Sequence, residues 1–238
     1  MSPNHPSILE SMEITPYAAY ALPFLGAVLG MGIARRATTD TAFGFKLILA
    51  FSGSFLLGIA IFHLMPLVFS TADSSIGLWI VGGLLLQTLL EHLSHGAEHG
   101  HAHIHTSERL PAVLFLSLGL HALVEGMPLE QNTALVWGVF VHKIPIGVVF
   151  FTLIKKIPMK EIKKLFYLAC FALMTPLGTL IGTQSYFETH LQTPLNALVL
   201  GMILHIATTI LFESNQSHAF NFKKLMTVVL GFTIAYIL

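Results

Sequence analysis

The sequence predicts an all-α integral membrane protein with eight transmembrane helices. Of its 238 residues, 54% are hydrophobic and only 10% are charged, and the mean hydropathy is +0.76. A soluble domain carries about 25% charged residues, so this chain has too few charges to cover a globular surface. Disorder is also excluded, because it requires low hydrophobicity and high net charge. The lipid bilayer is therefore the expected surrounding, and neither a soluble enzyme nor a nucleic-acid-binding protein fits this composition.

Eight apolar segments approach the length of about 20 residues that one membrane crossing requires. In chain order they span residues 17–34, 42–69, 76–91, 111–129, 134–154, 164–183, 194–212 and 222–238. The third segment is the least distinct, because its end merges into a histidine-rich stretch. The connections are too short for an additional soluble domain. We therefore expect residues 1–238 to form a single transmembrane domain that contains one longer loop, 92–110.

The connections between these segments alternate in charge. Eleven cations lie in or beside the first, third, fifth and seventh connections: Arg35, Arg36, Lys46, Arg109, Lys155, Lys156, Lys160, Lys163, Lys164, Lys223 and Lys224. The second, fourth and sixth connections have no Lys or Arg and carry Asp73, Glu130 and Glu188 instead. Cytoplasmic connections are enriched in Lys and Arg, so we expect a multi-pass protein of the plasma (inner) membrane with both termini extracytoplasmic and the loop 92–110 cytoplasmic. The alternation also supports eight segments independently of hydropathy.

Two adjacent segments carry ionisable side chains at membrane depth, where such groups are expensive and mark a functional site by default. In the fourth, His121 and Glu125 are four residues apart, so they share one helical face and can hold one divalent cation. In the fifth, His142 and Lys143 precede Pro145, which removes a backbone hydrogen bond inside the helix. Matching polar interruptions in neighbouring helices predict a binding site between them, near the middle of the membrane.

Other histidines and carboxylates suggest a pathway for the same ion. His63 and His205 lie inside the second and seventh segments, where hydrogen-bonded packing is the alternative explanation. A tract at the end of the third segment contains Glu91, His92, His95, Glu98, His99, His101, His103 and His105. Such a tract is typical of weak metal binding, which predicts a cytoplasmic exit or sensing site; a solvated loop without a metal is the alternative.

The motifs His121-Ala122-Leu-Val-Glu125-Gly126 and His142-Lys143-Ile-Pro145-Ile146 lie in the fourth and fifth segments. The sixth segment contains Thr175-Pro176-Leu177-Gly178. Together these motifs resemble those of the ZIP (ZRT/IRT-like) family of divalent metal transporters. The resemblance implies a ZIP-like helix bundle with inverted repeats, in which segments one to three are mirrored by six to eight around segments four and five. It also implies a homodimer, and glycines such as Gly26, Gly30, Gly58, Gly82, Gly83, Gly178, Gly182 and Gly201 are expected to permit close helix packing.

The resemblance further implies which residues bind metal. A first position draws on His121, Glu125 and His142, with Ile146 in place of a usual fourth ligand. A second position, occupied in many ZIP proteins, draws here on Ala122, Lys143, Ile146 and Thr175 and has lost its ligands, so one metal is expected rather than two. The Lys143 ammonium can take the place of the second cation and neutralise Glu125; alternatively, its head extends to an aqueous vestibule.

Two imidazoles and one carboxylate suit Zn²⁺ best and also Fe²⁺, Mn²⁺, Co²⁺ or Cd²⁺. The expected function is transport of such cations, zinc first, into the cytoplasm. The metal is then a transported substrate, and no resident cofactor is expected. A membrane metal sensor that does not transport is one alternative. An intramembrane zinc hydrolase is another, but it needs a general base, and Glu125 cannot serve as base without reducing the ligands to two. No enzyme activity is expected.

Overall fold

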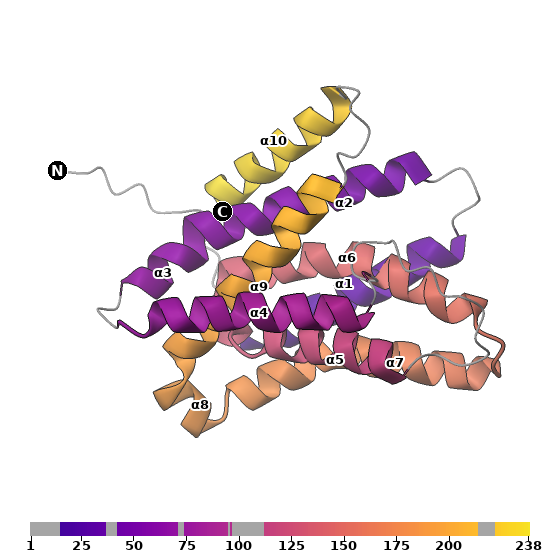
Figure 1. The fold of residues 1–238 in the computed structure, drawn as a ribbon. Helices are drawn as coiled ribbons and strands as arrows, with labels where there is room; N and C mark the ends of the chain where they lie inside the picture. The colour runs from indigo at the N-terminus through magenta and orange to yellow at the C-terminus, as the bar shows by residue number, and fades with distance from the viewer. Residues whose placement is uncertain (1–14, 37–41, 71–73, 95, 97–111, 214–221) are drawn as a thin grey trace.

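The protein is a bundle of long α-helices (Figure 1). This computed structural model describes residues 15–36, 42–70, 74–94, 96, 112–213 and 222–238. The helices are α1 (Pro16–Arg36), α2 (Ala42–Ile59), α3 (Met65–Phe69), α4 (Ile76–Ser94), α5 (Ala112–Gly126), α6 (Thr133–Lys156), α7 (Glu161–Gly182), α8 (Ser185–His190), α9 (Gln192–Glu213) and α10 (Phe222–Ile237). The described part contains no strand, so the predicted all-α class is confirmed.

Each predicted segment coincides with helical structure to within three residues. The second segment is one irregular rod, in which the π-helical turn Ala60–Leu64 joins α2 to α3. Pro66 is the second residue of α3 and has no N–H to donate to a carbonyl of the preceding turn, so a regular α-helical hydrogen-bond pattern cannot run through this point. The short helix α8 was not predicted.

Seven helical segments in the described part are long and apolar enough to cross a membrane. They are Pro16–Arg36, Gly44–Phe69, Ile76–Ser94, Ala112–Gln131, Thr133–Lys156, Glu161–Gly182 and Gln192–Phe212. The eighth predicted segment forms α10, whose 16 residues fall short of the length of about 20 residues for a full crossing. The protein is therefore a multi-pass membrane protein, and the count of eight spans stays a prediction.

The helix pairs follow an approximate two-fold pattern. Helix α1 packs on α6 as α7 packs on α5, and α4 packs on α9 as α10 packs on α2. Exchanging α1 with α7, α2 with α9, α4 with α10 and α5 with α6 converts each pair into its counterpart, as inverted repeats require. The contacts of α2 with α6 and of α4 with α5 have no counterpart of similar extent, so the two halves are not equivalent around the centre.

Glycines allow the close approach of the paired helices. A Cβ at Gly30 would overlap the Ile144 carbonyl between α1 and α6, and one at Gly178 would overlap the Leu123 carbonyl between α5 and α7. The packing role is confirmed for Gly26, Gly30, Gly58, Gly83, Gly178, Gly182 and Gly201. It is wrong for Gly82, where an added Cβ would meet no described atom within 4 Å because this position faces away from α9. Gly126 and Gly147 make similar close contacts and were missed.

Candidate metal site

Three potential metal ligands meet between α5 and α6. One ligand atom from each of His121, Glu125 and His142 lies within 4.8 Å of the other two. The one-turn spacing on α5 places His121 Nε2 3.6 Å from Glu125 Oε2. The His142 ring on α6 faces the His121 ring with centroids 6.2 Å apart and planes at 81°. All three side chains are buried, so the bundle brings together the group that the sequence predicted to share a cation.

Local structure explains how α5 and α6 present this group. Helix α5 ends at Gly126, and a 3₁₀ turn, Leu129–Gln131, leads into α6. The Asn132 side chain caps α6 by accepting a hydrogen bond of 3.0 Å from the backbone N–H of Leu135. Because the connection is short and capped, α6 begins at a fixed register and His142 falls at the level of His121.

The Lys143 ammonium donates a hydrogen bond of 2.5 Å to Glu125 Oε2. Each side chain of this ion pair is only 2% exposed. The second carboxylate oxygen of Glu125, Oε1, has no hydrogen-bond partner among the described residues. The geometry therefore matches the prediction that Lys143 neutralises Glu125, and it differs from the alternative in which the ammonium reaches an aqueous vestibule.

Gln87 on α4 is a buried partner of the site that the sequence prediction missed. Its side-chain oxygen accepts a hydrogen bond of 3.0 Å from His121 Nδ1. A proton held on Nδ1 leaves the Nε2 lone pair of His121 directed at Glu125 and available to a metal. Gln87 is uncharged, so a search for ionisable groups in apolar segments does not reach it. The sequence signal that could have identified Gln87 is a polar amide directly after the apolar run Leu84-Leu85-Leu86.

The residues predicted at the second metal position are all buried, and two of the four are apolar. Ala122 and Ile146 are buried within a hydrophobic cluster that includes Leu118 and Phe150. Thr175 on α7 is also buried, and its carbonyl oxygen accepts a hydrogen bond of 3.2 Å from the Thr179 hydroxyl. Ala122 and Ile146 have no metal-binding atom in their side chains, and Lys143 contributes an ammonium.

Glu91 and His205, two of the predicted pathway residues, contact each other. His205 Nε2 on α9 forms a hydrogen bond with Glu91 Oε2 on α4, and both side chains are partly exposed. Thr88 lies on the same face of α4 as Glu91, and its Oγ1 is 3.4 Å from His205 Nδ1. Gln87 and Glu91 are one turn apart on α4. Helix α4 thus carries polar side chains from the level of His121 towards its C-terminal end at Ser94, so the first residues of the predicted loop 92–110 are helical.

The remaining predicted pathway residues do not join this group. His63 lies in the π-helical turn, with Nε2 2.8 Å from the carbonyl oxygen of Ala235 on α10. This contact favours the packing explanation for His63. His92 is exposed near the end of α4. The other histidines of the tract, His95, His99, His101, His103 and His105, lie outside the described residues.

Comparisons with known proteins identify the family of this chain. The profile of the family described as ZIP zinc transporter matches residues 95–238. Zinc transporter ZIP1 of Danio rerio is 30% identical over an alignment 159 residues long, which covers 60% of this chain and 51% of that relative. The chain therefore spans about half the length of this curated relative. The matched region includes both helices that supply the buried His/Glu group. The chain belongs to the ZIP zinc transporter family.

Proposed function

We propose that this protein carries divalent transition-metal cations, zinc first, across the membrane into the cytoplasm through a single site. His121, Glu125 and His142 bind the ion. The observation that carries the proposal is their convergence, fully buried, between two membrane-spanning helices of a ZIP family member. Packing alone explains these three residues poorly, because burial of ionisable groups at membrane depth costs free energy and marks a functional site by default.

The donor set fits a transported metal better than a permanently held one. Imidazole nitrogens and a carboxylate oxygen suit zinc and its neighbours Fe²⁺, Mn²⁺, Co²⁺ and Cd²⁺. Structural zinc sites are closed by four protein ligands, whereas three ligands leave a coordination position open for water. An open position allows stepwise replacement of ligands, which an ion requires when it leaves. Zinc is therefore substrate here.

The site holds one metal rather than two. A second cation beside Glu125 would meet the apolar Ala122 and Ile146 and the ammonium of Lys143, which already contacts Oε2. In the metal-free state Lys143 neutralises the buried carboxylate. An incoming divalent cation repels this ammonium and competes with it for Glu125.

The exit follows α4. After leaving His121 the ion passes the Glu91–His205 pair and reaches the histidine tract of the loop 92–110. The cation-rich connections favour a cytoplasmic position for this end, and we propose a protein of the plasma (inner) membrane with both termini extracytoplasmic. Residues 1–238 act as one transmembrane domain, and a homodimer is part of the proposal by family resemblance alone.

Two other functions make different demands on the same residues. A non-transporting sensor would bind metal at His121 without moving it. A zinc hydrolase would need a general base beside a metal-bound water, but Glu125, the one carboxylate in the group, is the ligand and the partner of Lys143. We therefore propose transport and no enzyme activity.

Radioactive zinc uptake into proteoliposomes tests the proposal. The wild-type protein is expected to move zinc, whereas His121→Ala and His142→Ala are expected to lose both uptake and metal binding. His63→Ala is the matched control, because it removes an intramembrane imidazole that contacts α10 instead of the site. Metal binding without uptake by the wild-type protein would identify a sensor, and hydrolysis of a lipid or peptide would identify an enzyme.

A further inference from the structure

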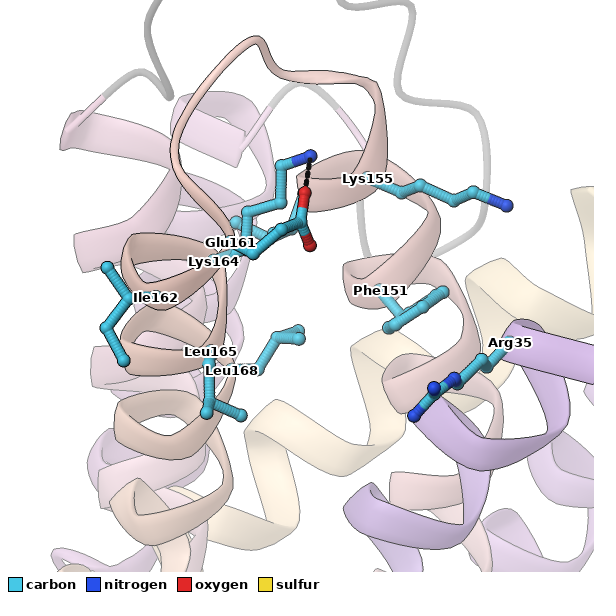
Figure 2. A pocket seen from close by; sticks show the side chains of 9 residues that line it. Arg35, Phe151, Lys155, Glu161, Ile162, Lys164, Leu165 and Leu168 are labelled. Carbon is cyan, nitrogen blue, oxygen red and sulfur yellow. Dashed lines mark hydrogen bonds and ion pairs between the residues drawn. The ribbon is translucent and has the colours of Figure 1, made fainter.

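A pocket of about 780 Å³ opens between α1, α6 and α7, away from the metal site. It lies at the end of the bundle where the cation-rich connections begin, because Arg35 is in the last turn of α1, Lys155 is in the last turn of α6 and Lys164 is in the first turn of α7. Figure 2 shows the Arg35 guanidinium turned towards the space between α1 and α7. None of these groups takes part in the proposed metal site.

Lys155 and Lys164 lie at the outer end of the pocket, whereas apolar side chains and the Arg35 guanidinium lie deeper (Figure 2). Phe151 is one turn below Lys155 on α6, and Leu168 is one turn below Lys164 on α7. One helical turn advances about 5.4 Å along the axis, so the apolar groups lie about that much closer to the membrane centre than the two lysines. Figure 2 shows the same order, with Phe151, Leu165 and Leu168 beneath the level of Lys155 and Lys164.

The charges in the pocket lining favour an anion. Arg35, Lys155 and Lys164 line the pocket together with a single carboxylate, Glu161, which accepts a hydrogen bond of 2.9 Å from Lys164. The Glu161 side chain is 88% exposed, so solvent screens it more than Lys164, which is 17% exposed. The pocket retains an excess of two positive charges over this carboxylate. Apolar side chains continue onto the outer face of α7, where Ile162 and Leu165 are 69% and 61% exposed.

We propose that this pocket binds an anionic phospholipid. Its phosphate lies among Arg35, Lys155 and Lys164, and one acyl chain follows Phe151, Leu165 and Leu168 towards the bilayer centre. A phospholipid has the same order of charged head and apolar tail as the pocket lining, at the same membrane level. Basic pockets between transmembrane helices recognise anionic headgroups in this way. A free inorganic phosphate uses the cations alone and leaves the apolar wall without a partner.

Lipid titration of the purified full chain, followed by native mass spectrometry, tests the proposal. The probes are phosphatidylglycerol and phosphatidylcholine with identical acyl chains, and inorganic phosphate is added as a competitor. The pocket variant is the double substitution Arg35→Ala/Lys155→Ala. The matched control, Lys156→Ala/Lys163→Ala, removes two cations from the same end of the bundle outside the pocket lining.

Phosphatidylglycerol is expected to bind about tenfold more tightly than phosphatidylcholine, because cations near the membrane surface attract anionic lipid. The pocket variant is expected to lose this preference, and the control variant to keep it. Equal binding of the two lipids, equal losses in both variants, or full competition by inorganic phosphate would each overturn the proposal.

A second measurement does not depend on the charge variants being well folded. Tryptophan fluorescence of a Phe151→Trp protein should be quenched by phosphatidylglycerol with brominated acyl chains, relative to the wild-type background from Trp79 and Trp137. Quenching equal to that background would contradict the acyl-chain position.

Discussion

Replacing Lys143 by methionine removes the buried ammonium and keeps an unbranched side chain of similar length. The ammonium lies 2.5 Å from Glu125 Oε2, and the two side chains are 2% exposed. Breaking a buried ion pair by removing one partner destabilises a protein by about 3–5 kcal/mol. Metal-free Lys143→Met is therefore expected to unfold at a lower temperature than the wild-type protein.

The same substitution is expected to tighten zinc binding. In the wild-type protein an incoming cation displaces a charge-assisted hydrogen bond, which contributes about 1.5–3 kcal/mol. The methionine variant has no such bond to break, so the zinc Kd is expected to fall by about 10- to 100-fold. Zinc should also restore more of the lost thermal stability in the variant than in the wild-type protein, because it supplies the missing partner of Glu125.

Isothermal titration calorimetry with a competing chelator measures the Kd, and thermal unfolding with and without zinc measures the stability. Lys163→Met is the matched control, because Lys163 is an exposed lysine of α7 outside the site. An unchanged zinc Kd together with an unchanged unfolding temperature of the metal-free variant would refute the reasoning. Tighter binding in the Lys163→Met control would assign the effect to net charge instead of the ion pair.

Three further perturbations test the site and the packing. Gln87→Leu removes the acceptor of His121 Nδ1–H while keeping a similar volume, so zinc affinity is expected to fall about 10- to 100-fold, measured by the same titration; full affinity would contradict the positioning role. Zinc uptake into proteoliposomes is expected to decline as pH falls, because protons compete with the metal for His121, His142 and Glu125; a rate independent of pH would argue against these ligands. Gly178→Ala is expected to lower the free energy of unfolding by about 1–3 kcal/mol through overlap with the Leu123 carbonyl, whereas Gly82→Ala, with open space, should not; equal unfolding temperatures would contradict the close approach of α5 and α7.

Much of the fold could be predicted from local properties of the sequence. Apolar runs give the positions of the membrane spans, because helices that cross the hydrocarbon core must be mostly apolar. The helical segments in the structure begin and end within three residues of the predicted segments. Glycine packing is harder to predict, because it depends on which helix face meets a neighbour. Gly82 and Gly83 are adjacent in sequence, yet only Gly83 would overlap the Leu198 carbonyl of α9.

In the candidate site, too, contacts within one helix could be predicted from the sequence, whereas contacts between helices could not. The spacing of His121 and Glu125 on one helix predicts their proximity, because helical geometry fixes it. The contact of Lys143 with Glu125 joins two helices, and the sequence alone did not favour it over an ammonium that extends to an aqueous vestibule. Gln87 contacts His121 from α4, 34 positions earlier in the chain, and its neutral amide gave no electrostatic signal.

The Lys143–Glu125 pair also bears on the proposed transport cycle, at the step in which the empty protein returns. A carrier that works by alternating access must return to its starting conformation without a bound ion. A buried carboxylate without a counter-charge would raise the free energy of that step. With Lys143 in place, the empty site is neutral, and the same ammonium weakens metal binding enough for release. Lys143→Met is therefore expected to lower both the half-saturating zinc concentration and the maximal rate of uptake in proteoliposomes. A lower half-saturating concentration with an unchanged maximal rate would confine the role of Lys143 to binding.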